Sequence, residues 1–195
     1  MSTVVPNAKC ELYYNTPYQL LIAVVLSAQC TDIRVNQVTK VLFDLAQDPI
    51  SMLELGESRL QQILYPLGFY KNKTINVLKL SQTLLDNYDG QVPSERQDLE
   101  SLAGVGRKTA NVILMECFNQ PFIAVDTHVY RVSRRLNLSN ATTPNGVEKD
   151  LYQNLPIELH HKAHHTILHF GRYFCKSQRP LCDGCVVRDY CTFVM

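Results

Sequence analysis

The stretch Leu102-Ala103-Gly104-Val105-Gly106-Arg107-Lys108-Thr109-Ala110 decides the fold of this chain, because it joins two segments with helical signatures. The segment before it is expected to start at Ser94 as N-cap, with Gln97 placed to complete a capping box. The join is short and holds two glycines, which allow a tight turn with exposed backbone N–H groups. These N–H groups and the N-terminus of the second helix suit an anion such as a DNA phosphate.

Lys108 falls on the first turn of the second helix. The positive end of the helix dipole disfavours a charged ammonium group there, and burial would act in the same direction. Both influences favour a neutral amine, which is the form that attacks carbon. The alternative is an exposed lysine that only touches a phosphate, and this role is much the commoner one for an isolated lysine.

The composition allows a sizeable hydrophobic core but gives little indication of a binding partner. The chain has 195 residues, 46% of them hydrophobic, enough for one large domain or two small ones. The longest apolar run, Leu20 to Leu26, is too short to span a membrane, and no signal peptide is present, so we expect a cytosolic protein. The net charge is only +1, but residues 1–100 have 8 basic and 11 acidic side chains, whereas residues 101–195 have 11 and 7. The basic half fits a DNA-facing surface or a solvated basic face.

Hydrophobic spacing and start signals predict a series of helices and no strand. Thr16-Pro17 opens an apolar segment whose length and start signal favour a buried helix over a buried strand. Outside the hairpin, the expected helices cover residues 18–29, 32–46, 49–55, 57–65, 72–88, 126–137, 144–154 and 157–174. The pattern Lys-Thr-x-Asn-Val occurs at 73–77 and again at 108–112, which indicates a second loop-to-helix turn facing the same side. We predict an all-α fold.

Four of the seven cysteines form the pattern Cys175-x6-Cys182-x2-Cys185-x5-Cys191 near the C-terminus. Cytosolic cysteines packed this closely are more often metal ligands than disulfides. Spacing alone leaves a zinc site and a 4Fe–4S cluster equally open. The remaining three cysteines, Cys10, Cys30 and Cys117, lie in apolar helical contexts and are expected in the core.

Asp126 stands between the apolar run Ile123–Val125 and the start of a new helix. Such an acid is often only an N-cap. Because it follows the lysine by one helix and one loop, it is also a candidate for the carboxylate that assists an activated amine.

Together these motifs resemble the endonuclease III family, the iron–sulfur members of the helix-hairpin-helix DNA glycosylases. The resemblance rests on 102–114, on Ala124-Val125-Asp126-Thr127-His128, on Leu26-Ser27-Ala28-Gln29 with Thr31-Asp32, and on the cysteine pattern. It covers nearly the whole chain. The resemblance decides the metal question in favour of 4Fe–4S, with Cys175, Cys182, Cys185 and Cys191 as ligands.

The resemblance implies a two-lobed helix-hairpin-helix glycosylase fold. A six-helix domain would cover residues 10–120, and residues 1–9 with 121–195 would form a second helical domain with the cluster loop. The implied activity is that of a bifunctional DNA glycosylase and abasic-site lyase, which excises oxidised pyrimidines and nicks the strand by β-elimination. The implied partner is double-stranded DNA with a damaged base or an abasic site, bound by a monomer in the cytoplasm at the nucleoid.

The same resemblance assigns roles to single residues. Lys108 takes the place of the nucleophile and Asp126 that of the catalytic carboxylate. The residues expected to contact DNA are Gln29, Phe69, Gly104, Gly106, Arg107 and His128. Gln29 corresponds to a side chain that fills the gap left by the flipped base. Phe69 departs from the family pattern, because an aliphatic wedge is usual at that position.

Three alternatives stay open at this point. An adenine-type mismatch glycosylase would share the cluster, and a monofunctional mismatch glycosylase would share the fold, but both lack the lysine. A non-catalytic DNA-binding module could keep the hairpin and the cluster. The presence of both Lys108 and Asp126 favours the bifunctional enzyme over all three.

Overall fold

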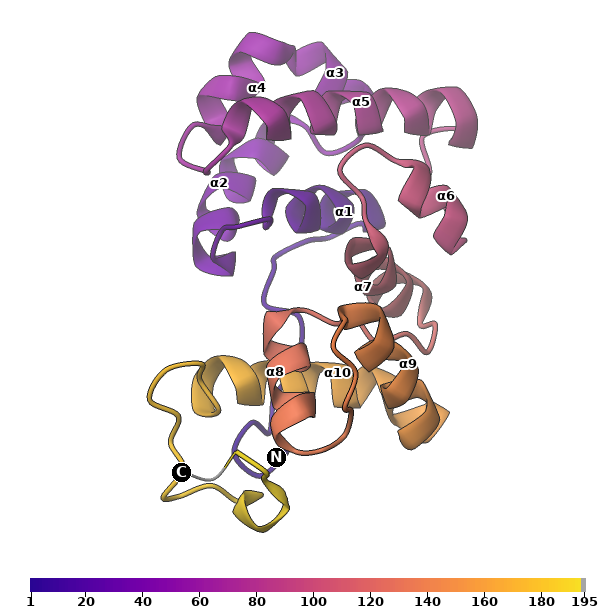
Figure 1. Cartoon of the computed structure of the whole chain (residues 1–195). Helices are drawn as coiled ribbons and strands as arrows, with labels where there is room; N and C mark the ends of the chain where they lie inside the picture. The colour runs from indigo at the N-terminus through magenta and orange to yellow at the C-terminus, as the bar shows by residue number, and fades with distance from the viewer. Residues whose placement is uncertain (194–195) are drawn as a thin grey trace. The chain divides into compact units, whose positions relative to one another are not determined.

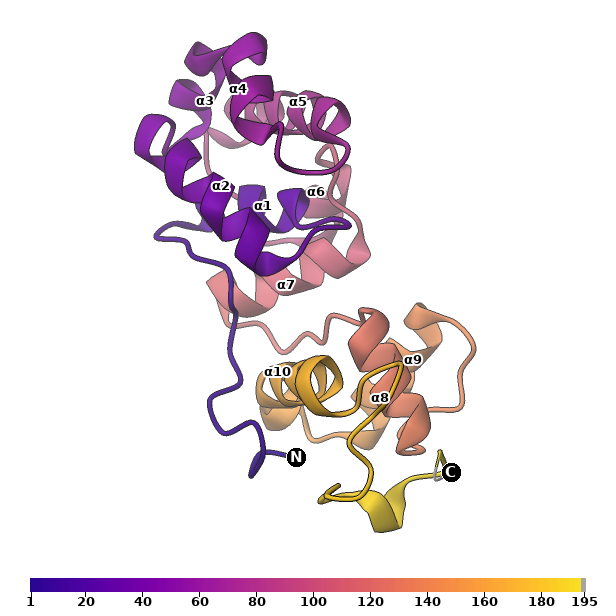
Figure 2. The same ribbon diagram turned by 90° about the vertical axis from the view of Figure 1, so that its left-hand side faces the viewer.

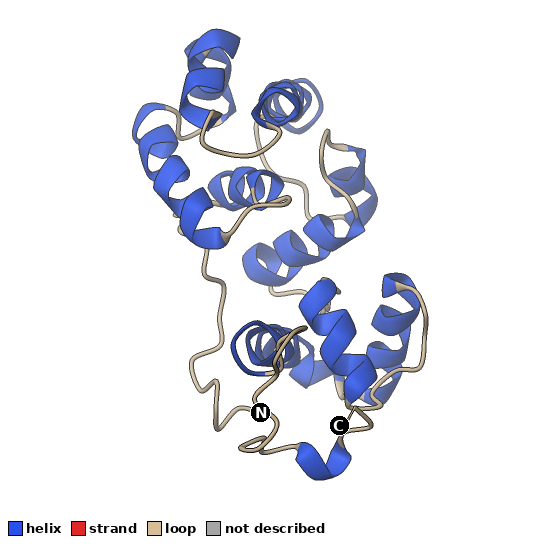
Figure 3. Ribbon diagram, turned by 60° about the vertical axis from the view of Figure 1, so that its left-hand side comes forward, coloured by secondary structure: helices blue, strands red, loops and turns tan. Residues whose placement is uncertain are grey.

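The computed structural model describes residues 1–193, and it is helical throughout. The part of the chain that it describes contains no β-strand (Figure 3), which confirms the all-α prediction. No helix in that part is long and apolar enough to cross a membrane.

The chain folds into two compact units. Glu11–Phe118 forms one of them, here called the hairpin unit. The other consists of Met1–Cys10 together with the chain from Asn119 onward, and is here called the cysteine-loop unit.

The hairpin unit, all of which is described, has seven α-helices (Figure 1). Its helices are α1 Pro17–Leu26, α2 Asp32–Leu45, α3 Pro49–Leu55, α4 Glu57–Leu64, α5 Tyr70–Tyr88, α6 Arg96–Ser101 and α7 Arg107–Phe118. Helices α3 and α4 are separate, as predicted. The break occurs at Gly56, whose φ of 74° suits glycine and breaks the helical path.

Helix α1 forms the centre of the hairpin unit, where it packs against α2, α5 and α7 (Figures 1 and 2). Every residue of α1 after Pro17 is buried, as expected for a helix that is apolar on all sides. Its start matches the prediction, because the Thr16 side chain accepts a hydrogen bond from the Gln19 N–H at 3.2 Å. The helix ends at Leu26, and the predicted extension to Gln29 is wrong because Gln29 adopts a φ of 55°.

Two other sequence-based details of this unit need correction. Helix α6 begins at Arg96 with Glu95 as its N-cap, so the expected start of this helix with Ser94 as N-cap is wrong. In α2, Val38 and Leu42 are buried as expected, whereas Ile33, Val41 and Leu45 are exposed. The apolar stripe of α2 is therefore wider than the surface its neighbours cover.

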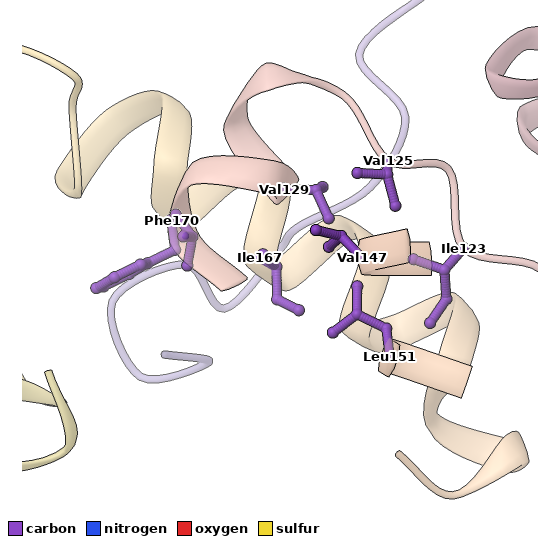
Figure 4. Packing of buried hydrophobic residues seen from close by; sticks show 8 residues of the cluster. Ile123, Val125, Val129, Val147, Leu151, Ile167 and Phe170 are labelled. Atoms are coloured by element: carbon purple, nitrogen blue, oxygen red, sulfur yellow. The ribbon is translucent and has the colours of Figure 1, made fainter. Parts of the chain in front are cut away.

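The cysteine-loop unit is built around a small apolar core (Figure 4). Its helices are α8 Thr127–Arg135, α9 Pro144–Asn154, the 3-10 turn η1 Ile157–Leu159, α10 His160–His169, the π-helical turn η2 Phe170–Phe174 and the 3-10 turn η3 Arg188–Tyr190. The core residues are Ile123, Val125, Val129, Val132, Val147, Leu151, Ile167 and Phe170. Helix α9 has the predicted bounds, and the helix predicted over 157–174 consists of three consecutive segments of different pitch.

Helix α8 packs against α10 and against the π-helical turn η2 (Figure 2). A Cβ atom at Gly171 in η2 would lie 3.0 Å from the Cβ of His128 and 3.0 Å from Cγ2 of Val132. Any other residue at this position would force His128 or Val132 to shift by a few tenths of an ångström. The contact brings the start of the cysteine loop next to α8, which carries Asp126 at its N-terminus.

Candidate functional site

The turn of the hairpin is held by two buried apolar residues, Leu102 and Val105. The Val105 N–H donates to the Leu102 carbonyl at 3.1 Å and closes the turn. Gly104 has a φ of 79°, and a Cβ atom there would lie 2.9 Å from Nδ2 of Asn76. A Cβ atom at Gly106 would meet no atom within 4 Å, and Gly106 does not have a positive φ. Gly104 is therefore required by the fold, whereas Gly106 leaves open the space in front of the turn.

Helix α7 begins directly after this turn. Arg107 is its first residue and Lys108 its second, and both side chains are exposed. Burial, which we expected as one influence on the Lys108 amine, is not present in the structure. Its place on the first turn of α7 is as predicted, so the amine is accessible beside the N–H groups of a helix start.

Gln29 and Phe69 lie in two loops of the hairpin unit, and both side chains are exposed. Gln29 follows the end of α1, and Phe69 is the N-cap residue of α5. In the Phe69 loop, Leu67 is buried and its N–H donates to the Leu64 carbonyl at 2.8 Å. This anchor fixes the loop while leaving 63% of Phe69 exposed.

A buried lysine connects these two loops. Lys73, on the first turn of α5, is only 5% exposed, and its Nζ donates to Sγ of Cys30 at 3.2 Å. Cys30 directly follows Gln29, so the bond ties the Gln29 loop to the helix that begins after Phe69. The three cysteines Cys10, Cys30 and Cys117 are only partly buried, and their expected place in the core is wrong.

Asp126 is the N-cap of α8. Its Oδ1 accepts hydrogen bonds from the N–H groups of His128 and Val129, both at 2.8 Å. The structural role that the sequence suggested for this acid is therefore real. Both bonds go to one oxygen, and within the described residues the second oxygen accepts no hydrogen bond.

His128 is half-buried on the first turn of α8. Burial lowers the pKa of His128 below its usual 6.5, and the positive charges of Arg131 and Arg172 act in the same direction. Asp126 and a hydrogen bond with the Gly171 backbone oppose the shift of this pKa. A neutral imidazole therefore stands beside Asp126 at neutral pH, with Nδ1 3.3 Å from Nη2 of Arg131.

The cysteine loop supplies a set of thiol ligands. All seven cysteines of the chain lie in its described part, and none of them forms a disulfide there. The loop contains two short turns, in which the Cys185 N–H donates to the Cys182 carbonyl at 3.1 Å and the Cys191 N–H donates to the Arg188 carbonyl at 3.0 Å. Nη1 of Arg135 lies 3.3 Å from Sγ of Cys175. Four thiols in turns, with a cation at the first, fit an iron–sulfur cluster, whose thiolate ligands are negatively charged.

The predicted residues divide between the two units. Gln29, Phe69, the glycine turn and Lys108 belong to the hairpin unit, and Asp126, His128 and the cysteine loop belong to the other. Sequence reasoning missed Lys73, Arg131 and Arg135. Only the spacing of the two arginines, four residues apart on the helix after Asp126, offered a signal that they share one face.

Family models match most of the chain. Residues 22–156 match the model described as HhH-GPD superfamily base excision DNA repair protein. Residues 175–191, which span the four-cysteine pattern, match the iron–sulfur binding domain of endonuclease III. The cofactor of this chain is accordingly the 4Fe–4S cluster of that family.

Full-length relatives agree with the models. Endonuclease III of Bacillus subtilis is 46% identical over 95% of this chain and 85% of that protein. Endonuclease III of Escherichia coli is 41% identical over 96% of this chain and 89% of that protein. A solved structure of a trapped endonuclease III–DNA covalent intermediate, an estranged-adenine complex, superposes with a TM-score of 0.94 at 45% identity, over 98% of this chain and 90% of the other. The chain therefore belongs to the endonuclease III family of the HhH-GPD superfamily, and it is a DNA-binding base excision repair enzyme with glycosylase and abasic-site lyase activity.

Proposed function

We propose that Lys108 is the nucleophile of this glycosylase and lyase and that Asp126 is its catalytic carboxylate. The observation that carries the proposal is the exposed amine on the first turn of α7, directly after the open glycine turn. Asp126 supports it, because its N-cap bonds use only one carboxylate oxygen.

The proposed reaction starts with extrusion of the damaged base, because its glycosidic carbon is not reachable inside the stack. The neutral Lys108 amine attacks C1′ of the sugar, the bond from C1′ to the base breaks, and the base leaves with a proton. Asp126 takes up or returns a proton, or offsets positive charge that develops on the sugar. The amine and the opened sugar then form an imine, which acidifies the C2′ hydrogen. Loss of that proton expels the 3′ phosphate and breaks the strand.

We propose that the substrates are oxidised pyrimidines and abasic sites in double-stranded DNA. Gln29 would fill the space of the flipped base and Phe69 would stack beside the lesion, where both exposed side chains could reach the bases. The backbone of Gly104 and Gly106, with Arg107, would hold a phosphate.

His128 is proposed to line the site as a neutral imidazole, in keeping with its lowered pKa.

Cys175, Cys182, Cys185 and Cys191 are the proposed ligands of the cluster. A bound 4Fe–4S cluster ties four thiolates together and can exchange an electron. We also propose domain limits at residues 10–120 and at 1–9 with 121–195, a monomeric enzyme, and a place in the cytoplasm at the nucleoid.

Borohydride trapping tests the nucleophile. An abasic duplex mixed with the enzyme and sodium borohydride should yield a covalent protein–DNA complex, because the reductant converts the imine to a stable amine. Lys108→Ala should abolish the complex and the strand cleavage. Lys108→Arg should also fail, since a guanidinium stays protonated. Lys79→Ala, which removes another exposed lysine of the same unit, is the matched control and should trap normally. An undiminished yield from Lys108→Ala would exclude this lysine.

A further inference from the structure

The side chain of Arg135, the last residue of α8, is buried against the start of the cysteine loop. Its Nη1 lies 3.3 Å from Sγ of Cys175 and donates to the Lys176 carbonyl at 2.8 Å. Its Nη2 donates to the Ser177 carbonyl at 3.3 Å. The residue is only 9% exposed, whereas its neighbour Arg134 is exposed.

The same residue also contacts the other end of the loop. The Arg135 carbonyl accepts hydrogen bonds from the Thr192 N–H at 2.8 Å and from the Thr192 hydroxyl at 3.1 Å. The guanidinium carbon lies 3.7 Å from the centre of the Phe193 ring. Thr192 and Phe193 directly follow Cys191, so one residue binds both the first and the last segment of the cysteine pattern.

A buried cation needs a matching negative charge. The partners that the described structure gives Arg135 are a sulfur, carbonyl oxygens and an aromatic ring, and no carboxylate is among them. A thiolate at Cys175 would supply this charge, because cysteine ligates iron in its deprotonated form.

We propose that Arg135 is a positioning residue for the cluster, which joins the two ends of the cysteine loop and raises the reduction potential of the bound cluster. Hydrogen bonds to the sulfurs and the net charge around a cluster set its potential. A cation beside a ligand sulfur stabilises the reduced, more negative form. The inference rests on the proposed ligation by the four cysteines.

The test compares Arg135→Met, Arg135→Lys and the control Arg134→Met, each purified with its cluster. Arg134 is adjacent on α8, but its guanidinium contacts the Ala141 carbonyl at 3.2 Å rather than the cysteine loop. Three quantities are measured: helical content, the rate of iron release to a chelator, and the midpoint potential by voltammetry.

Arg135→Met should release iron faster than the control and have a more negative midpoint potential. The expected change in the ratio of reduced to oxidised cluster is up to about tenfold, which corresponds to about 59 mV for one electron. Arg135→Lys keeps the charge but not the branched contacts, so it should release iron faster while its potential stays nearer that of the unsubstituted protein.

Equal iron release and equal potential in Arg135→Met and Arg134→Met would overturn the proposal. If Arg135→Met loses its helical content, the test rests on Arg135→Lys. An iron-release rate of Arg135→Lys equal to that of Arg134→Met would then overturn the proposal. Failure of the ligand assignment is a separate result, because Cys175→Ala would then keep the full iron content of the unsubstituted protein.

Discussion

Gln29 and Phe69 share a left-handed backbone conformation, with φ of 55° and 57°, although neither is a glycine. A side chain at such a φ costs roughly 1–2 kcal/mol relative to ordinary conformations. Both residues are exposed, so burial of their own side chains does not offset this cost. Strain of this kind persists only where the surrounding structure holds the residue in place. The two residues proposed to enter the DNA stack are therefore held in place by their loops.

Phe69→Ala should slow excision of a damaged base more than cleavage of a ready-made abasic site. Stacking of an aromatic ring on a base is worth about 1–3 kcal/mol, so excision should fall roughly tenfold or more. The abasic sugar has no base to extrude and should be cleaved almost normally. Asp89→Gly, at the other end of α5 with a φ of 51°, is a matched backbone control and should leave both rates unchanged. Equal losses of activity on the two substrates would show that Phe69 does not act as a wedge.

Cys30→Ala should destabilise the protein, because it removes the sulfur that accepts a hydrogen bond from the buried Lys73 ammonium. The expected loss in the free energy of unfolding is about 1–3 kcal/mol. The double variant Cys30→Ala with Lys73→Met should lose less than the sum of the single changes, since no buried charge then remains. Strictly additive losses in denaturant unfolding would show that the two side chains do not interact.

Substitution by alanine should affect stability at one glycine of the hairpin and DNA binding at the other. Gly104→Ala should destabilise the fold by more than about 1 kcal/mol, because of its positive φ and the contact with Asn76. Gly106→Ala should leave stability within about 0.5 kcal/mol, since its Cβ meets open space. Affinity for undamaged duplex at fixed salt should nevertheless fall in Gly106→Ala, as the methyl group crowds the phosphate. Unchanged affinity would mean that the turn does not anchor DNA.

Asp126→Asn should separate the two functions of this residue. Asparagine is as good an N-cap as aspartate, so thermal stability should be nearly unchanged, whereas Asp126→Ala should cost about 1 kcal/mol. Excision should be slow in both variants, because neither side chain can take up a proton or offset positive charge. A fully active Asp126→Asn would leave Asp126 with the capping role alone.

The lowered pKa of His128 predicts a pH dependence of stability. As the pH falls below about 6.5, the unfolded chain binds this proton more readily than the folded chain, so the free energy of unfolding decreases. Above that pH the imidazole is neutral in both states and contributes no slope. His128→Gln should therefore be less sensitive than the unsubstituted protein to acidification from pH 7 to 5, measured by thermal unfolding. Parallel pH profiles of the two proteins would contradict the assignment.

Local signals predicted the helices well where a single residue type decides the structure. Thr16 and Asp126 cap α1 and α8 as expected, because their side chains satisfy N–H groups within three residues. The Ser94 cap failed, since α6 starts two residues later. The predicted end of α1 at Gln29 was wrong, because Gln29 adopts a left-handed backbone conformation that is typical of glycine or asparagine.

Long-range contacts of charged residues could not be predicted from local patterns. Lys73 and Arg135 both look like surface residues in the sequence, yet each is buried by a partner more than 35 residues away. The choice of partner depends on how the helices pack, which hydrophobic spacing does not specify. The exposed side chain of Lys108 is likewise a result of tertiary structure, whereas its place on the first turn of α7 followed from the glycine turn alone.

Helix α5 joins the Phe69 loop to the hairpin turn. Phe69 caps the helix, and Asn76, seven residues later, touches Gly104. Seven residues of α-helix span roughly 10 Å, about the rise of three stacked nucleotides. Since a helix hardly changes its length, α5 keeps the Phe69 loop and the hairpin turn at a fixed distance from each other. On the proposed roles it sets how many nucleotides separate the phosphate that the enzyme holds from the base step that it tests.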